Sequence, residues 1–173
     1  QKPAEGLEHQ VPLPDLLPPE ECIGAMEAIA RNPQISDGFI QRMSNPWPFE
    51  MRSHRPDSGE SNSQQYEWLK AVAPLPDDPL MHQAALGFAS DMGLLSTSMI
   101  PHNMHWSTPG MFSTSLDHAM WFHDDFRVDE WFVYVMDCDW TGHARGLNRG
   151  AIYTQDGRMI ASAVQEGMIR INK

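Results

Sequence analysis

The sequence predicts an α+β fold in which a curved antiparallel sheet wraps around one long central helix. The first observation is a helical pattern from Leu80 to Leu95, where apolar side chains recur every three or four residues. The second is the segment after Pro101, where helix signals stop and long runs of strand-forming residues are joined by short connections. Such sequential strands form an antiparallel meander, which buries its apolar face against the helix.

The first 20 residues are predicted to be an extended arm. They hold five prolines and few bulky apolar groups, a composition typical of linkers. A short helix is predicted from Glu20 to Arg31, because proline in the first turn and acids near the N-terminus favour a helix start. Asn32-Pro33 is expected to end it, since the residue before a proline avoids helical backbone angles.

Two short strands are predicted next, from Pro48 to Arg52 and from Gln64 to Ala73. At 173 residues, the chain suits one domain plus an extension and is long enough to bury a core. We therefore divide it into an arm with a short helix over residues 1–45 and a C-terminal domain over residues 46–173.

The long helix is preceded by a turn with a helix start at Leu75–Pro79. Because the segment from Leu80 to Leu95 is largely apolar, we expect the helix to be buried. Asp91 falls near its C-terminal end, where the helix dipole disfavours an acid. We therefore expect Asp91 either to be exposed or to be kept for a purpose.

Long strands are predicted over the rest of the chain. A hairpin turn joins the last two at Gln155-Asp156-Gly157, where glycine supplies a positive φ. The predicted strands are Met111–His123, Trp131–Thr141, Ala144–Thr154 and Arg158–Ile171.

The charge balance argues against some classes of partner. The net charge is −11, whereas surfaces that bind nucleic acid or anionic membranes carry clustered Lys and Arg. A small anionic ligand stays compatible, because a few local Arg can hold a phosphate. With 41% hydrophobic residues and six Trp, the composition is that of a globular protein.

Signals for the compartment are weak. Cys22 and Cys138 lie far apart and in no metal or redox spacing, which favours two reduced thiols. We expect no membrane span, since no run of about 18 apolar residues occurs, and we recognise neither a signal peptide nor a peroxisomal C-terminal tripeptide. The sequence begins at Gln1 without Met, so a missing terminal signal carries little weight.

The stretch from Ser113 to His123 is the first place to look for chemistry. It holds three hydroxyls, one acid and two imidazoles, and such groups are costly to bury unless they are hydrogen-bonded or used. As one strand, it would place Ser115 and His118 on opposite faces, and likewise His118 and His123. The imidazoles then match no known metal-ligand pattern, so we expect no metal. We expect His118 and Asp117 to support a site through hydrogen bonds.

Four passages stand out in order along the C-terminal domain. They are Phe88–Asp91, Ser115–His123, Ala144–Gly150 and Gln155–Gly167. Together they resemble the acyl-CoA thioesterase II family, whose members hydrolyse fatty acyl-CoA and have a double hotdog fold. The Asp-His-x-x-Trp-Phe-His and Gln-Asp-Gly…Gln-Glu-Gly elements are long and specific. The resemblance implies that the sheet and the helix form one hotdog, half of a double hotdog.

The family uses an Asp, a Thr or Ser, and a Gln to activate a water, and by motif position these are similar to Asp91, Ser115 and Gln165. Thioester hydrolysis needs a base for the proton of the water and a donor for the oxyanion, which these side chains can supply. The resemblance implies hydrolysis of fatty acyl-CoA to fatty acid and CoA, without a cofactor or a covalent intermediate. Arg145 and Arg149 are candidate ligands of a CoA phosphate.

The chain is about half as long as members of this family, and it corresponds to their C-terminal hotdog and connecting arm. Because acyl-CoA sites of hotdog proteins lie between two paired units, we expect pairing with an N-terminal hotdog half or with a second copy of the chain, and hence a homo-oligomer. The resemblance implies a peroxisomal location if the source is eukaryotic and a cytoplasmic one if it is bacterial.

Two other functions stay open. The chain can be a non-catalytic hotdog module that binds acyl chains or pairs subunits. It can also be a hotdog dehydratase, although we find no motif for the acid or imidazole that this reaction needs at the substrate α-carbon. Convergence of Asp91, Ser115 and Gln165 within hydrogen-bond distance would favour the hydrolase over the module.

Overall fold

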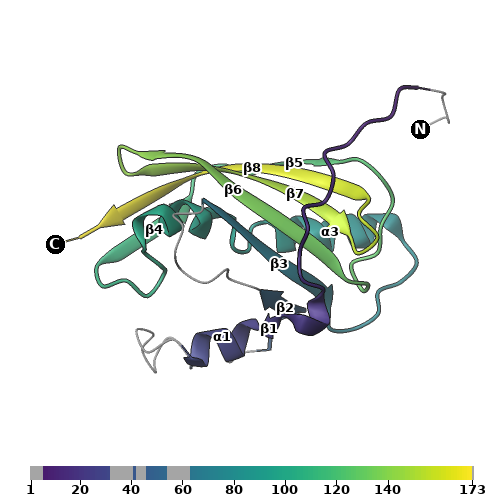
Figure 1. Cartoon of the computed structure of the whole chain (residues 1–173), viewed down its shortest axis with the longest axis horizontal. Helices are drawn as coiled ribbons and strands as arrows, with labels where there is room; N and C mark the ends of the chain where they lie inside the picture. Colours follow the sequence, from purple (N-terminus) through teal and green to yellow (C-terminus); the bar gives the residue numbers. More distant parts are fainter. Residues whose placement is uncertain (1–5, 32–40, 42–45, 54–62, 173) are drawn as a thin grey trace.

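An antiparallel sheet dominates the structure, a computed structural model that describes residues 6–31, 41, 46–53 and 63–172 (Figure 1). The sheet has eight strands within these residues, in the order β1-β2-β3-β6-β7-β8-β4, and β5 also pairs with β8. This architecture confirms the predicted α+β class. The elements are η1 Pro19–Glu21, β1 Ile23–Gly24, α1 Ala25–Arg31, β2 Phe49–Ser53, β3 Gln64–Ala71, α3 Pro79–Ser90, η2 Leu94–His102, β4 Met111–Ser115, β5 Ala119–Phe122, β6 Phe132–Gly142, β7 Arg145–Thr154 and β8 Met159–Ile171.

The meander β6-β7-β8 forms the middle of the sheet, and the three strands agree with the prediction within one residue at each end. Gly157, in the β7–β8 turn, has a φ of 88°, as expected for a glycine in that hairpin. The short strands β2 and β3 are also confirmed close to their predicted bounds. Alternation of side chains along these long strands sends one set to each face of the sheet.

Helix α3 covers one face of the sheet, here called the inner face. Leu86 and Ala89 are fully buried in a core that includes Phe132 of β6 and Ile152 of β7. The expectation that the whole helix is buried is wrong, because its other side is open and Phe88 is 54% exposed. A helix that is apolar on both sides but packed on only one leaves apolar surface uncovered.

The long helix ends earlier than predicted. Its last residue is Ser90, and Asp91 is the C-terminal capping residue. Gly93 then adopts a left-handed conformation with φ of 82°, and the 3-10 helix η2 comes next, so the helical pattern up to Leu95 spans two different elements. A left-handed residue just past the last turn is a common helix stop, and glycine adopts it at least cost.

The single strand predicted from Met111 to His123 is broken into β4 and β5. At the break, the N–H groups of Leu116 and Asp117 both donate to Glu166 O, at 2.9 and 3.4 Å. Glu166 N in turn donates to Asp117 Oδ1 at 2.8 Å. This irregular pairing with β8 interrupts the alternation of faces, so the prediction based on a continuous strand fails across it.

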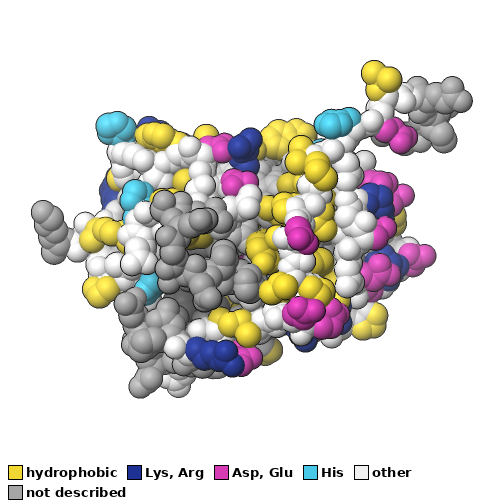
Figure 2. All heavy atoms as spheres, in the orientation of Figure 1, with side chains coloured by type: hydrophobic (Ala, Val, Ile, Leu, Met, Phe, Trp, Pro, Cys, Tyr) yellow, Lys and Arg dark blue, Asp and Glu magenta, His cyan; other side chains and the backbone are white. Residues whose placement is uncertain are grey.

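The N-terminal arm is attached to the sheet over its described part. It crosses β6, β7 and β8 in Figure 1, on the outer face, opposite the one covered by α3. The Gln10 amide donates to Gly157 O at 2.7 Å and accepts from Met159 N at 2.9 Å. Trp68 Nε1 donates to Leu17 O at 2.8 Å. Figure 2 shows hydrophobic side chains gathered along the line of the arm, so this segment helps to close a second apolar core.

The helix predicted from Glu20 to Arg31 begins too early. Residues Pro19–Glu21 form a 3-10 turn, and Ile23–Gly24 pair with β2 before α1 starts. Pairing with a distant strand therefore overrides the local helix signal here. The predicted helix end at Asn32-Pro33 lies outside the described residues, and the division of the chain at residue 45 stays a prediction. No helix in the described part is long and apolar enough to span a membrane.

Candidate active site

Asp91, Ser115 and Gln165 meet at one point on the inner side of the sheet. Asp91 caps the C-terminus of α3, Ser115 is the last residue of β4, and Gln165 lies in the middle of β8. The Ser115 hydroxyl donates to Asp91 Oδ1 at 3.2 Å. Gln165 Nε2 donates to Asp91 Oδ1 at 2.5 Å and lies 3.1 Å from Ser115 Oγ. Three residues far apart in sequence thus form one hydrogen-bonded cluster, here called the triad.

The triad is buried at one end and open to solvent at the other, here called its mouth. Gln165 is fully buried, whereas Asp91 and Ser115 are both exposed. Phe88, one turn before Asp91 on α3, and Leu116, next to Ser115, are exposed apolar side chains beside the mouth. A ligand that approaches the triad from solvent therefore meets a carboxylate and a hydroxyl flanked by apolar groups.

A histidine and a second serine extend the triad. Gln165 Nε2 lies 3.2 Å from His118 Nδ1, and His118 Nε2 lies 2.8 Å from Ser90 Oγ. His118 therefore lies on the same side as Ser115, which corrects the prediction of opposite faces. The break between β4 and β5 explains the difference. His123 does lie on the opposite face, where its Nε2 is 2.8 Å from Ser162 Oγ.

Sequence reasoning assigned no role to Ser90, Ser98 or Asn148. Asn148 is buried directly opposite Gln165 in the β7–β8 pair, and Ser98 Oγ donates to its Oδ1 at 2.7 Å. A Cβ on Gly146 would lie 2.0 Å from Ser98 Oγ, so glycine allows η2 to approach β7 this closely. The motif from Ala144 to Gly150 contains Asn148 and Gly146, but only the fold reveals that Asn148 pairs with Gln165 and that Gly146 lets η2 approach β7.

The electrostatic surroundings of Asp91 are unusual for a surface acid. None of the ion pairs between described residues involves Asp91, and its position at the helix C-terminus adds an unfavourable dipole. Burial raises the pKa of the Tyr134 phenol above its usual range, and the carboxylates of Asp91 and Glu67 raise it further. Tyr134 therefore stays neutral, and the described side chains that donate to the carboxylate of Asp91 are the neutral Ser115 and Gln165.

Arg145 and Arg149 are not part of this cluster. The β7–β8 register places both on the outer face, opposite Gln165. Arg145 forms an ion pair with Glu166 at 3.1 Å, and Arg149 forms one with Asp139 at 2.8 Å. Arg145 also lines an open hollow of about 480 Å³ at the end of the sheet, together with His102 and Arg170. Their role in phosphate binding stays a prediction.

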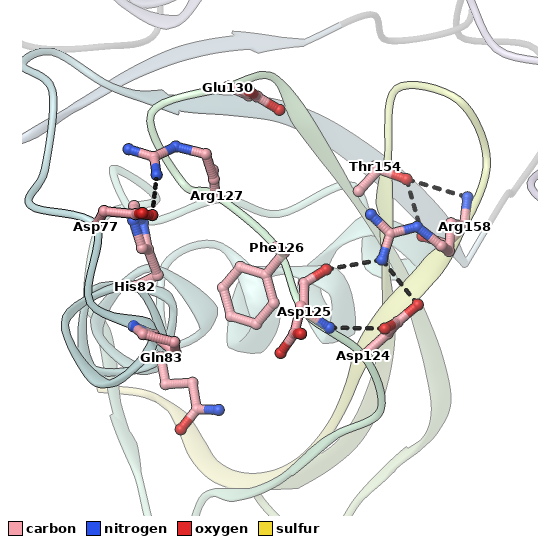
Figure 3. A pocket seen from close by; sticks show the side chains of 11 residues that line it. Asp77, His82, Gln83, Asp124, Asp125, Phe126, Arg127, Glu130, Thr154 and Arg158 are labelled. Atoms are coloured by element: carbon pink, nitrogen blue, oxygen red, sulfur yellow. Dashed lines mark hydrogen bonds and ion pairs between the residues drawn. The ribbon is translucent and has the colours of Figure 1, made fainter. Parts of the chain in front are cut away.

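A separate pocket of about 340 Å³ lies at the N-terminal end of α3 (Figure 3). Phe126 stands in its centre, with Asp77 and His82 on the helix side and the Asp124–Arg158 ion pair across from them. The pocket contains no member of the triad. In the described part of the chain, no group of three or more His, Cys, Asp or Glu side chains is placed to hold a metal ion.

Known proteins provide a direct comparison for this arrangement. The family model described as acyl-CoA thioesterase matches residues 38–168. The chain is 33% identical over 178 residues to human acyl-coenzyme A thioesterase 8, a match that covers 95% of this chain and 55% of the relative. It is 30% identical over 178 residues to acyl-CoA thioesterase 2 of Haemophilus influenzae, which covers 100% of this chain and 62% of the relative.

Solved structures agree with the sequence matches. The structure of acyl-CoA thioesterase II TesB2 from Mycobacterium marinum is similar with a TM-score of 0.77 and 31% identity, over 100% of this chain and 61% of that one. A hot dog fold protein of unknown function from Alicyclobacillus acidocaldarius, with a TM-score of 0.68 and 15% identity, supports the fold alone. The chain spans 55 to 62% of the length of these curated relatives. The fold is therefore the predicted hotdog, and the chain belongs to the acyl-CoA thioesterase family.

Proposed function

We propose that the protein formed by this chain hydrolyses fatty acyl-CoA to a free fatty acid and CoA, using a water activated at Asp91, Ser115 and Gln165. The observation that carries the proposal is the hydrogen-bonded cluster of these three side chains, in a chain whose family model is named for this activity. A carboxylate with two neutral hydrogen-bonding partners suits the activation of water in a hydrolysis without a metal.

In this mechanism, Asp91 takes a proton from the water as the water oxygen attacks the thioester carbonyl carbon. The carbonyl oxygen becomes negative, and a hydrogen-bond donor at the buried end of the site stabilises it. When the intermediate collapses, the C–S bond breaks, the acid product keeps the new C–O bond, and the CoA thiolate recovers the proton. Ser115 already donates to Asp91, and no hydrogen bond joins it to an imidazole among the described residues, so it orients the reactants rather than attacking.

The open mouth of the triad supports a site that a second unit completes. Asp91 and Ser115 are exposed beside the exposed side chains of Phe88 and Leu116, and the chain corresponds to little more than half of its relatives. We therefore propose that an N-terminal hotdog half or a second copy of this chain covers the mouth and helps to form the acyl channel.

Of the two arginines, Arg145 is the better candidate for a CoA phosphate. It lies beside Arg170 and His102 at an open hollow, about 10 Å along β7 from Asn148 at the usual rise per residue. Both arginines lie on the outer face and form ion pairs, but Arg149 does not line this hollow. A yeast relative is named as a peroxisomal acyl-coenzyme A thioester hydrolase, so we propose the peroxisome for a eukaryotic source and the cytoplasm for a bacterial one.

The test is release of free CoA thiol from a long-chain acyl-CoA by the purified protein. We expect Gln165→Ala to abolish thiol release, because the change deletes the hydrogen-bond donor at the buried end of the triad. Gln83→Ala is the matched control, since Gln83 lies on α3 at the separate pocket. If the folded chain is inactive both alone and when joined to an N-terminal hotdog half, the proposal is wrong and a non-catalytic pairing or acyl-binding module remains.

A further inference from the structure

We propose that His118 is a positioning residue that holds the Gln165 amide in one orientation, and that it does so as the neutral tautomer with its proton on Nε2. The inference deepens the proposed function and rests on it for its catalytic meaning, but the geometry stands by itself. His118 connects Gln165 on β8 to Ser90 on α3 through two hydrogen bonds, of 3.2 and 2.8 Å. Removing His118 would therefore break the link between Gln165 and Ser90 and leave the Gln165 amide in contact with Asp91 and Ser115 alone among the described side chains.

The hydrogen bonds of Ser90 determine the tautomer. A serine hydroxyl has one proton to donate, and Ser90 Oγ donates it to Gly87 O at 2.9 Å within α3. Ser90 can then only accept from His118 Nε2, at 2.8 Å. Nε2 of His118 must therefore carry the proton, and in the neutral ring Nδ1 is left as an acceptor.

The carboxylate of Asp91 leads to the same result from the other side. Gln165 Nε2 lies 2.5 Å from Asp91 Oδ1, and an amide oxygen placed there would repel an ionised carboxylate. The amide nitrogen must therefore face Asp91, and the same nitrogen lies 3.2 Å from His118 Nδ1. An N–H donor facing Nδ1 requires that Nδ1 carry no proton, which agrees with the tautomer that Ser90 demands.

The hydrogen bonds that orient the Gln165 amide are all made by one end of the amide group. Gln165 Oε1 is buried without a hydrogen bond among the described residues, whereas Nε2 faces Asp91, Ser115 and His118. An amide free to rotate would exchange the two ends and place an acceptor at the triad. His118 and Asp91 together prevent this exchange.

This orientation determines what Gln165 can do in the reaction. An amide nitrogen has two protons, so when His118 accepts one, the other is available to Asp91, Ser115 or the developing oxyanion. Gln165 is thereby fixed as a donor and cannot accept a proton from the water. Among the three side chains of the triad, Asp91 is then the group that takes the proton released by the water.

Nitrogen NMR of the folded 173-residue chain tests the tautomer without reference to activity. Long-range proton–nitrogen correlations distinguish ring nitrogens with and without a proton, and loss of the signals in His118→Asn identifies His118. We expect a protonated Nε2 and a bare Nδ1 in the wild type, and the same tautomer in Ser90→Ala, because the Gln165 amide nitrogen still faces Nδ1 there. A proton on Nδ1 of the wild-type protein would overturn the proposal, because Gln165 would then face His118 with its oxygen.

Kinetics then test the positioning role in the active form of the protein. We expect His118→Ala to lower kcat about tenfold with little change in KM, as for a group whose loss displaces a catalytic neighbour. His118→Asn should keep a larger share of kcat, since its amide oxygen replaces Nδ1 as the acceptor. His123→Ala is the matched control, because His123 bonds Ser162 on the outer face.

The two measurements separate this inference from the proposed function. If Nδ1 is bare but the protein hydrolyses no acyl-CoA, the proposed tautomer is supported and the proposed thioesterase function is wrong. If the enzyme is active and kcat is equal in wild type, His118→Ala and His118→Asn, the thioesterase function is supported and the positioning role of His118 is wrong.

Discussion

The two ends of helix α3 use the same types of residue for opposite purposes. At the N-terminal end, Asp78 caps the helix by accepting from Leu80 N at 3.0 Å. Arg127, close by, binds Asp129 at 3.0 Å and Asp77 at 2.9 Å. At the C-terminal end, Asp91 has no ion-pair partner among the described residues. Acids are stabilised at one end of the helix and left unneutralised at the other.

The difference separates acids that stabilise the fold from an acid that the fold alone does not explain. A carboxylate at a helix N-terminus gains from the dipole, whereas one at the C-terminus loses about 0.3 to 1 kcal/mol. The N-terminal acids can therefore be understood from the folded state alone. The helix dipole disfavours a carboxylate at the position of Asp91, and an acid at this position is explained if it takes a proton from water during the reaction.

Replacing Asp91 by Asn should give the largest effect. The change keeps the shape of the side chain but removes the base, so we expect thiol release to fall about a hundredfold or more, the contribution typical of a general base. Urea unfolding should show a free energy that is unchanged or up to about 1 kcal/mol higher, because the unfavourable dipole term is lost. A clear loss of stability would mean that Asp91 is a structural acid.

Replacing Asp129 by Asn should affect stability instead. Its carboxylate is only 10% exposed and accepts from Arg127 and from Leu75 N, and the hydrogen bonds from Arg127 lower its pKa to about 2. We expect unfolding to become easier by roughly 2 kcal/mol at neutral pH. Asp77→Asn is the control, since Asp77 is 98% exposed and its ion pair with Arg127 should contribute little.

The stability from Asp129 should also depend on pH. Because its folded pKa of about 2 lies below the ordinary value of 3.8, the contribution is present above pH ~4 and is lost as the pH falls towards ~2. The difference in unfolding free energy between wild type and Asp129→Asn should therefore shrink over this interval. An equal difference at pH ~7 and pH ~2 would contradict the assignment.

Ser115 should tolerate threonine but not alanine. Ser115→Thr keeps a hydroxyl that can donate to Asp91 and accept from Gln165, whereas Ser115→Ala keeps neither contact. We expect thiol release to fall about tenfold in the alanine variant, the loss of one charge-assisted hydrogen bond, and to change less in the threonine variant. Equal activity of all three proteins would remove Ser115 from the mechanism.

The helix cap should give the smallest effect. Asp78→Ala removes the acceptor for Leu80 N and should lower the unfolding free energy by about 1 kcal/mol, with catalysis unaffected. Asp78→Ser should restore most of the loss, because serine is also a good N-terminal cap. Chemical denaturation of the three proteins, with thiol release measured beside it, checks both parts.

Local patterns predicted the centre of the sheet well and its irregular edges badly. Strands β6, β7 and β8 are long and joined by short turns, so sequence periodicity alone placed their ends. The break between β4 and β5 depends on Asp117 binding Glu166 N, a contact between residues far apart in sequence. The early start predicted for the first helix failed for a similar reason, since Ile23 and Gly24 pair with β2.

The triad could be proposed from sequence only through the family resemblance. Nothing in the local pattern distinguishes Ser115 from an ordinary strand serine, and Gln165 is hidden among small residues of β8. Ser90 could not be foreseen, because its contact with His118 requires α3 to lie against the break between β4 and β5. The resemblance supplied the proposed reacting groups, while the fold was needed to find the residues that contact them.

The decisive measurement is a crossed comparison of Asp91→Asn and Asp129→Asn, each assayed for thiol release and for urea unfolding in the active form of the protein. We expect the Asp91 variant to lose activity with its stability intact, and the Asp129 variant to lose stability with its activity intact while folded. If Asp91→Asn keeps wild-type turnover, the two ends of α3 do not divide chemistry from stability, and the assignment of the reacting base is wrong.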